Sequence, residues 1–166
     1  MSVRAHLGLG GNLGDPKVAM AAALRAIDAR DDCAVAAVSR LFRTPPWGKT
    51  DQPDFLNACV AVETELSPRQ LLDLCLRTER DFKRVRAERW GPRTLDIDVL
   101  DFGGTTYRDE ALTLPHPRIA ERAFVLVPLA DIAPDLVIDG RKVAELVDML
   151  DAGVIAPMTE DGAWWR

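Results

Sequence analysis

Two opposite kinds of charge stand side by side in one stretch of the chain. The segment from Lys83 to Arg93 holds five basic residues and one acid, in a chain whose net charge is −5. Gly91 and Pro92 rule out a regular helix there, so we expect a loop of guanidinium groups around Trp90. Guanidinium groups bind phosphate oxygens through paired hydrogen bonds. The loop is therefore typical of a site for a phosphorylated ligand.

Two carboxylates follow this basic loop. The segment from Leu95 to Leu100 alternates apolar and polar residues. This pattern predicts a strand with Asp96 and Asp98 on one face, roughly 7 Å apart at Cβ. Mg²⁺ prefers one or two carboxylates together with substrate phosphates. Arginines beside such a pair indicate a polyphosphate bound between them. The alternative is a solvated basic loop followed by an ordinary half-exposed strand.

The elements that must position these residues follow from the hydrophobic pattern. Alternating residues predict a strand at Val3–Leu9, and Asp15 before Pro16 predicts the start of a helix that runs to Ala29. A second helix begins after Ser67. The remaining expected elements are strands at 33–42, 55–66 and 95–100, a helix at 68–82, a mostly helical segment at 118–130 interrupted by Pro128, a strand and Asp-Gly turn at 136–142, and a helix at 143–150.

Two nucleotide-binding patterns are incomplete in this chain. Leu13 stands where a dinucleotide-binding G-x-G-x-x-G needs its last glycine. Gly48-Lys49-Thr50 resembles the end of a Walker A loop, but Arg43 stands where that loop needs its first glycine. The segment 43–54 is longer than a hairpin requires and is stiffened by prolines, which favours a functional loop.

The composition indicates one domain spanning residues 1–166, because 48% of the 166 residues are hydrophobic. The order β-α-β-β-α-β predicts an α+β, ferredoxin-like core, with helices flanking a mainly antiparallel sheet and a C-terminal αβ extension. The three cysteines lie in apolar segments, which indicates buried reduced thiols. With no apolar run long enough to span a membrane and no signal peptide, we expect a cytoplasmic protein. The acidic total argues against nucleic-acid and membrane partners.

Five motifs occur in order along nearly the whole chain: Gly10–Gly14, Thr44–Pro46, Gln52–Ala58, Arg89–Asp98 and Pro115–Pro117. Together they resemble the 6-hydroxymethyl-7,8-dihydropterin pyrophosphokinase family of folate biosynthesis. The resemblance implies a diphosphotransferase that moves pyrophosphate from ATP to the hydroxymethyl group of the pterin and releases AMP. It implies two Mg²⁺ ions, with ATP and 6-hydroxymethyl-7,8-dihydropterin as substrates, and we expect a monomer.

The resemblance also assigns residues to roles. As catalytic residues it implies Arg84, Arg93, Asp96 and Asp98, of which the two aspartates also bind Mg²⁺. For ATP it implies Glu79, Arg84, Arg86, Trp90, Arg93, His116 and Arg122, with the arginine loop closing over the triphosphate. For the pterin it implies Thr44, Pro45, Pro46, Trp47, Phe55, Asn57, Trp90, Asp96 and Phe124. Taken alone, each aromatic residue and His116 also fits ordinary packing or a loop, and Glu79 fits a surface ion pair with Lys83.

The chain departs from the family pattern at several positions. Leu76 stands where family members often carry glutamine, Lys83 where they often carry glycine, and Trp47 replaces a smaller apolar residue. The segment 86–89 also looks shorter than in some relatives. From the residues alone, three other functions stay open. They are RNA binding by the arginine loop, ligand binding without catalysis, and an ATP-dependent kinase for another flat heterocycle.

Overall fold

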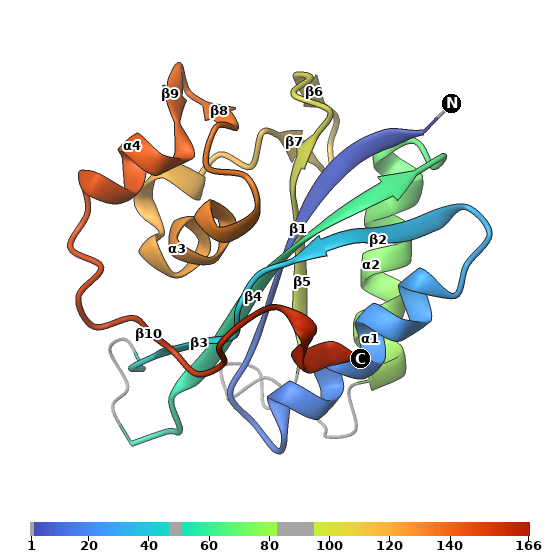
Figure 1. The fold of residues 1–166 in the computed structure, drawn as a ribbon. Helices are drawn as coiled ribbons and strands as arrows, with labels where there is room; N and C mark the ends of the chain where they lie inside the picture. The colour runs from blue at the N-terminus through green and yellow to red at the C-terminus, as the bar shows by residue number, and fades with distance from the viewer. Residues whose placement is uncertain (1, 47–50, 83–94) are drawn as a thin grey trace.

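The computed structural model describes residues 2–46, 51–82 and 95–166, and its centre is a six-stranded sheet with antiparallel pairing throughout (Figure 1). From edge to edge the strands are β10 (Ala156–Pro157), β3 (Phe42–Thr44), β4 (Phe55–Thr64), β1 (Val3–Gly11) and β5 (Asp96–Phe102), while β2 (Cys33–Val38) pairs with the other half of β4. This order confirms the predicted ferredoxin-like core.

Helices α1 (Pro16–Asp28) and α2 (Pro68–Phe82) lie together on one face of the sheet (Figure 1). Asp15 begins α1 because its carboxylate accepts a backbone amide of the first turn at 3.2 Å. Ser67 and Gln70 begin α2 as a reciprocal pair, in which each side chain accepts the backbone amide of the other. Within the described residues, no helix is long and apolar enough to cross a bilayer.

The main core lies between these two helices and the sheet. Met20, Leu24 and Ile27 of α1 are almost completely buried there, as are Leu71 and Cys75 of α2. Burying an aliphatic side chain of this size contributes about 1.5–3 kcal/mol. All three cysteines are buried and free, as predicted, and burial raises the pKa of each thiol above its usual 9.0.

The C-terminal part of the chain covers the opposite face of the sheet (Figure 1). It consists of η1 (Ile119–Glu121), α3 (Ala123–Ile132), β8 (Val137–Ile138), β9 (Arg141–Lys142) and α4 (Val143–Asp148). Side chains of α3 and α4 form a second core against β4 and β5. The predicted Asp-Gly turn joins β8 to β9, with a positive φ at both of its residues. The sheet therefore lies between two helical layers, and its second face carries the predicted αβ extension.

The prediction of one continuous strand at residues 33–42 is wrong, because the strand is interrupted between β2 and β3. At the break, the Ser39 hydroxyl accepts the Cys59 amide at 2.9 Å, while the Ser39 amide donates to the Cys59 carbonyl. A side chain thus takes the place of a backbone acceptor in the ladder, and the strand cannot continue regularly. The two halves pair separately along β4.

The prediction that Pro128 interrupts a helix is also wrong. Helix α3 continues through Pro128, which is buried in the second core. Proline removes one backbone hydrogen bond from a helix, and packing of the apolar helix α3 outweighs that loss. The helical segment is interrupted instead at Arg122, whose extended backbone (φ −113°, ψ 95°) separates η1 from α3.

The C-terminal segment, which the sequence did not place, is part of the fold. After β10, the helical turn η2 (Ala163–Trp165) lies against α1. Trp165 is 5% exposed, and its carbonyl accepts a hydrogen bond from the Arg25 guanidinium at 2.9 Å. The Trp164 indole donates to the Ser39 carbonyl at 2.8 Å. The segment therefore connects α1, through Trp165, with the interruption between β2 and β3, through Trp164.

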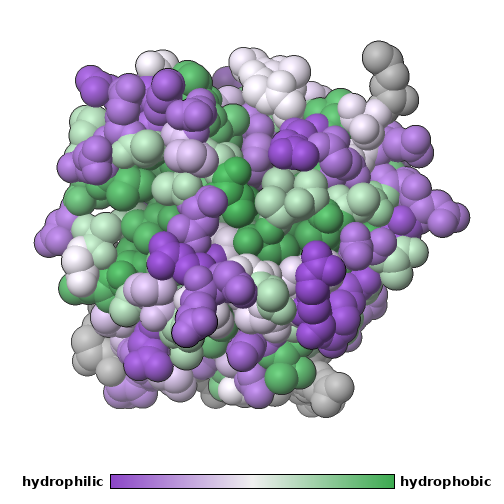
Figure 2. Space-filling model, viewed as in Figure 1, coloured by the Kyte–Doolittle hydropathy of each residue, from purple (hydrophilic) through white to green (hydrophobic). Residues whose placement is uncertain are grey.

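A groove borders this segment. Figure 2 shows hydrophobic side chains near the middle of the face drawn, with hydrophilic residues around them. The groove has a volume of about 500 Å³, and its lining includes Val35 and Val38 of β2 together with Trp165 and Arg166. The Arg166 guanidinium lies 4.9 Å from the centroid of the Trp165 ring, a cation–π contact between two neighbouring residues of this lining.

The approach of the C-terminal segment to β2 depends on a glycine. A Cβ at Gly162 would overlap the carbonyl oxygen of Val38. We expect Gly162→Ala to lower the free energy of unfolding by about 1–3 kcal/mol, the usual cost of overpacking, in urea titrations. Gly153→Ala is the matched control, because its Cβ would meet only the Asp151 side chain at 3.6 Å. Equal stability of both variants would show that the segment does not pack as described.

Candidate active site

Asp96 and Asp98 lie on β5, on the face of the sheet opposite α1 and α2. Asp96 stands across from Gly10 of β1, and Asp98 stands across from Gly8. Asp96 is half-buried and Asp98 is exposed, whereas Ile97 between them is buried in the main core. The two carboxylates therefore share one face of the strand, as their spacing predicts.

Gly10 lies beside Asp96 on β1 and leaves a flat surface without a side chain, which we call the floor of the site. Gly10 pairs with Asp96 on one side and with Asn57 of β4 on the other, so these three residues form one row across the sheet. A Cβ at Gly10 would come within 2.7 Å of Asn57 Nδ2, which excludes any larger residue without a shift. Neighbouring strands are about 4.8 Å apart, so Asp96 and Asn57 face each other across about 10 Å with no side chain of β1 between them.

Asn57 is 8% exposed, and its amide is held in one orientation. The Thr44 hydroxyl donates to Asn57 Oδ1 at 3.1 Å, and Nδ2 lies on the Gly10 side. Thr44 stands opposite Phe55 in the pairing of β3 with β4, and Pro45–Pro46 follows it directly. The structure thus brings together an amide, a hydroxyl and an aromatic ring that the sequence assigned to pterin binding.

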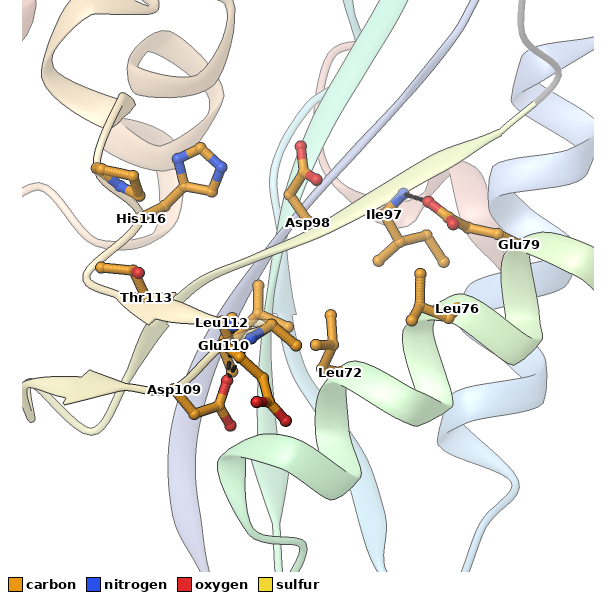
Figure 3. Close-up of a pocket in the computed structure, with 13 residues that line it drawn as sticks. Leu72, Leu76, Glu79, Ile97, Asp98, Asp109, Glu110, Leu112, Thr113 and His116 are labelled. Atoms are coloured by element: carbon orange, nitrogen blue, oxygen red, sulfur yellow. Dashed lines mark hydrogen bonds between the residues drawn. The ribbon is translucent and has the colours of Figure 1, made fainter. Parts of the chain in front are cut away.

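Glu79 connects α2 to the strand that carries the aspartates. Its Oε2 accepts a hydrogen bond from the Ile97 amide at 2.7 Å (Figure 3). Hydrogen bonds to an ionised carboxylate are stronger than those between neutral groups. Because Ile97 lies between Asp96 and Asp98, this bond fixes the outer edge of β5 where both carboxylates originate. Lys83, the alternative partner expected from the sequence, lies outside the described residues.

A pocket of about 380 Å³ opens beside Asp98 (Figure 3). Helix α2, strand β5 and the hairpin of β6 (Tyr107–Arg108) and β7 (Thr113–Leu114) surround it. Leu72 and Leu76 of α2 form an apolar wall, and polar side chains from the other elements form the rim. Ligand sites for small molecules are typically about 300–1,000 Å³, so this pocket has the size of one. Its lining is more polar than that of most such sites, because it includes the carboxylates of Glu79, Asp98, Asp109 and Glu110.

His116 lies at the rim of this pocket, on the same side as Asp98 (Figure 3). Its backbone amide donates to the Leu100 carbonyl at 2.9 Å, and its Nδ1 accepts the Arg118 amide at 3.2 Å. Burial lowers the pKa of His116 below the usual 6.5, against the opposing effect of the nearby Asp98 carboxylate. The ring is therefore neutral at pH 7. With Nδ1 occupied as an acceptor, Nε2 carries the proton and is a donor.

Arg122 and Phe124 meet at the start of α3. The Arg122 guanidinium lies 5.8 Å from the centroid of the Phe124 ring, which is 37% exposed. Stacking of this kind keeps a guanidinium in place without using its hydrogen-bond donors. A residue predicted for ATP and one predicted for the pterin are thus in contact with each other.

Asn12 is a residue of this region whose role sequence reasoning missed. It is 2% exposed, and its Nδ2 donates to the Gln52 side chain at 2.8 Å and to the Pro53 carbonyl at 3.1 Å. These bonds tie the turn after β1 to the chain that enters β4. The signal was present, because both residues lie in recognised motifs, but a spacing of 40 residues gives no indication that they touch.

The donor set of β5 suits Mg²⁺. Asp96 and Asp98 offer hard oxygen ligands on one face, and the described residues contain no group of three or more histidine, cysteine or acidic side chains that would enclose a metal. Two carboxylates without a closed cage are what a Mg²⁺ ion shared with substrate phosphates requires. The other predicted site residues lie outside the described part of the chain: Trp47, Arg84, Arg86, Trp90 and Arg93.

Asp109 closes the far side of the pocket through a local network. The Tyr107 hydroxyl donates to it at 2.6 Å, and the amides of Ala111 and Leu112 donate to its other oxygen. These hydrogen bonds, with Tyr107 as the largest contribution, lower the pKa of Asp109 from 3.8 to about 2. Its contribution to stability is complete above the unfolded pKa of 3.8 and is lost as the pH falls to about 2.

We expect Tyr107→Phe to weaken this dependence on pH. The variant should be less stable than the wild type at pH 6, and the difference should shrink as the pH falls from about 4 to 2, because the protonated carboxyl no longer favours the hydroxyl donor. Urea unfolding at several pH values measures it. In an Asp109→Asn background, Tyr107→Phe should have an effect that is independent of pH, and a persistent pH dependence there would assign the titration to another group.

Comparison with known proteins identifies the family of the chain. Residues 6–134 match the family described as 7,8-dihydro-6-hydroxymethylpterin-pyrophosphokinase (HPPK). A Methylorubrum extorquens protein named 2-amino-4-hydroxy-6-hydroxymethyldihydropteridine pyrophosphokinase is 55% identical over 148 residues, which cover 89% of this chain and 94% of that protein. A Pseudomonas aeruginosa protein of the same name is 45% identical, with 89% and 91% covered. One from Haemophilus influenzae is 43% identical, with 87% and 91% covered.

Solved structures with the same fold include wild-type Plasmodium falciparum HPPK-DHPS with STZ-DHP, with a TM-score of 0.72. The match has 15% identity and covers 90% of this chain and 43% of that chain, so it supports the fold alone. The family model and the curated relatives cover most of the sequence. The chain therefore belongs to the 7,8-dihydro-6-hydroxymethylpterin-pyrophosphokinase family and is an enzyme of that pyrophosphokinase type, as its motifs predict.

Proposed function

We propose that the chain transfers pyrophosphate from ATP to the hydroxymethyl oxygen of 6-hydroxymethyl-7,8-dihydropterin in folate biosynthesis, giving the pterin diphosphate and AMP. It acts as a single-domain monomer in the cytoplasm. The row formed by Asp96, Gly10 and Asn57 is the observation that carries this proposal. An amide that can bind a heterocycle edge and a carboxylate that can hold a cation face each other across a floor without side chains. A flat acceptor placed on that floor reaches both.

The pterin side of the site uses the end of β3 and β4. Asn57 Nδ2 faces the floor as a donor, because Thr44 occupies Oδ1. A pterin edge carries amide-like donors and acceptors, which a buried amide binds selectively. Phe55 and Phe124 supply flat apolar surfaces, and Pro45–Pro46 supplies a stiff wall with backbone carbonyls. In this proposal Trp47 and Trp90 complete the enclosure.

The metal side uses β5. Asp96 and Asp98 would hold two Mg²⁺ ions, which would supply positive charge to the phosphates and would lower the pKa of the acceptor hydroxyl. Glu79 keeps both aspartates in place through the Ile97 amide. A bond forms between the hydroxymethyl oxygen and the β-phosphorus of ATP while the bond from that phosphorus to the α-β bridging oxygen breaks. The hydroxyl proton is released, and AMP leaves with the bridging oxygen.

The nucleotide side uses the pocket beside Asp98. The pocket takes the nucleoside, with His116 Nε2–H donating to a phosphate oxygen and Arg122 adding positive charge. The neutral ring can fill this role because its Nε2–H remains available as a donor while Nδ1 accepts the Arg118 amide. In this proposal the triphosphate oxygens are bound by Arg84, Arg86 and Arg93. Closure of that arginine segment over ATP excludes water and suppresses hydrolysis.

The first test separates this transfer from ordinary phosphorylation. The protein is incubated with ATP, Mg²⁺ and 6-hydroxymethyl-7,8-dihydropterin, and the nucleotide products are separated by chromatography. AMP that appears only with the pterin supports the proposal. ADP would mean transfer of the γ-phosphoryl group, and nucleotide release that does not depend on the pterin would mean hydrolysis.

Asp98→Asn should lower turnover by more than about 10²-fold, because it removes an anionic metal ligand while keeping the shape of the side chain. Asp73→Asn is the control, since Asp73 is an exposed carboxylate of α2 that pairs only weakly with Arg69 at 3.8 Å. Turnover is measured as AMP release at saturating substrate and several Mg²⁺ concentrations. A turnover of Asp98→Asn equal to that of Asp73→Asn would remove Asp98 from the metal site.

Gly10→Ala tests the floor. The added methyl group would meet Asn57 Nδ2 at 2.7 Å and should weaken pterin binding by roughly one hydrogen bond, about tenfold, with a smaller effect on ATP. Gly8→Ala is the comparison, because its Cβ meets Leu100 at an ordinary 3.5 Å and lies in the row of Asp98 rather than that of Asn57. Titration of each variant with the pterin measures the difference. Similar pterin affinities for the two variants would show that Asn57 does not bind the pterin edge.

A further inference from the structure

A buried polar pair lies on the same face of the sheet as the site, farther along β1. His6 Nδ1 and Asp101 Oδ2 are 3.2 Å apart, and the two side chains are 7% and 3% exposed. Burial of such groups is costly unless their hydrogen bonds are complete, and replacing them with apolar residues is often neutral or stabilising. A pair of this kind need not stabilise the fold, and its position in the sheet indicates another role.

The pair flanks an irregularity in β5. Leu7 pairs with Val99, but the next pair along the strands is His6 with Asp101, so Leu100 is an extra residue on β5. An extra residue of this kind is a β-bulge, which bends the strand and redirects the groups beside it. The bulge lies directly between Asp98 and the His6–Asp101 pair.

The extra residue holds the segment that carries His116. The Leu100 carbonyl accepts the His116 amide at 2.9 Å, and the Leu100 side chain is buried in the second core. Asp98 lies two residues before it on the same strand. The bulge therefore sets, through the Leu100 carbonyl, where His116 stands at the rim of the pocket relative to Asp98.

Asp101 is the group that fixes the register after the bulge. One carboxylate oxygen lies against His6, and the other accepts the Gly104 amide at 3.1 Å. Gly103 and Gly104 both have positive φ, so the turn that follows is tight and fixed to the same carboxylate. A pairing shifted by one residue would break both of these bonds and would turn side chains to the other face.

We propose that His6 and Asp101 are positioning residues for the nucleotide side of the active site. They hold the β5 bulge in one register, and the bulge carries His116 to its place beside Asp98. The proposal rests on the proposed function in so far as Asp98 and His116 bind the metal and the nucleotide. The pterin contacts Asn57, Thr44 and Phe55 lie on β3 and β4, beyond β1, and do not depend on the bulge.

Three variants test this proposal against a purely structural role. Asp101→Leu removes both hydrogen bonds but leaves His6 buried without its partner, so it combines a loss of positioning with a loss of stability. The double variant His6→Phe/Asp101→Leu fills the same space with apolar groups and is designed to recover stability without the bonds. Asp101→Asn keeps both contacts, because its Nδ2 can donate to His6 Nδ1 while its Oδ1 accepts the Gly104 amide.

The expected result is a separation between the two substrates. With Mg²⁺ and a non-hydrolysable ATP analogue, the double variant should bind about tenfold more weakly than the wild type, the factor for one lost hydrogen bond to the nucleotide. Its affinity for the pterin, measured without nucleotide, should stay within about twofold. Asp101→Asn should restore nucleotide affinity. Thr64→Val is the matched control, since it removes buried hydrogen bonds of β4 to Cys33, Asp32 and Leu66 away from the bulge.

A second measurement does not depend on the proposed function. Amide hydrogen exchange of the peptide that contains His116 should be faster in the double variant than in the wild type and in Asp101→Asn, because the bond to the Leu100 carbonyl is no longer held. If the wild type fails to bind the nucleotide, the proposed function fails while this exchange result still tests the bulge. Unchanged exchange and unchanged nucleotide affinity in a folded double variant would overturn the proposal, as would an equal loss for both substrates.

Discussion

The close approach of β1 and β4 at Gly10 is the constraint on which the site depends. A Cβ at that position would collide with the Asn57 amide, so the central strand carries no side chain where the carboxylate of one neighbour and the amide of the other face each other. The spacing of strands then sets the distance between Asp96 and Asn57 at about 10 Å. Two chemically different groups are held at a fixed separation by the backbone hydrogen bonds of three neighbouring strands.

The two faces of the sheet divide the work of this domain. One face carries the large apolar core with α1 and α2, which supplies most of the stability. The other face is only partly covered by α3 and α4, and the polar site occupies the part left open. Polar residues of the site therefore need no space within the main core. The strand alternation that places Ile97 in that core is the same alternation that places both aspartates outside it.

The sequence predicted those parts of the fold that depend on neighbouring residues. The alternation around Asp96, the cap and proline that begin α1, and the order of elements were all visible in short windows of the chain. The break between β2 and β3 was not, because it depends on the Ser39 hydroxyl taking a backbone partner in another strand. The interruption at Pro128 was predicted wrongly, and the docking of Trp165 on α1 was not predicted at all. The reason is the same, because tertiary packing decided both.

The candidate site shows the same division. The resemblance to the family assigned Asn57, Glu79 and His116 to the site, but it did not show what each one contacts. That Glu79 holds the Ile97 amide, or that Asn12 holds the chain before β4, follows from pairings across 18 and 41 residues. No periodicity within a single segment records such pairings. Residue types and motif positions therefore supplied candidates for the site, while their hydrogen-bond partners required the structure.

The place of β5 at the edge of the sheet explains why the nucleotide pocket forms where it does. Within the described residues β5 pairs only with β1, so its outer backbone groups need other partners. The Ile97 amide finds the Glu79 carboxylate, and the Leu100 carbonyl finds the His116 amide. In a central strand, both backbone groups would form hydrogen bonds to a neighbouring strand. The free edge instead binds a side chain of α2 and the segment after β7, and these two connections define opposite walls of the pocket around Asp98.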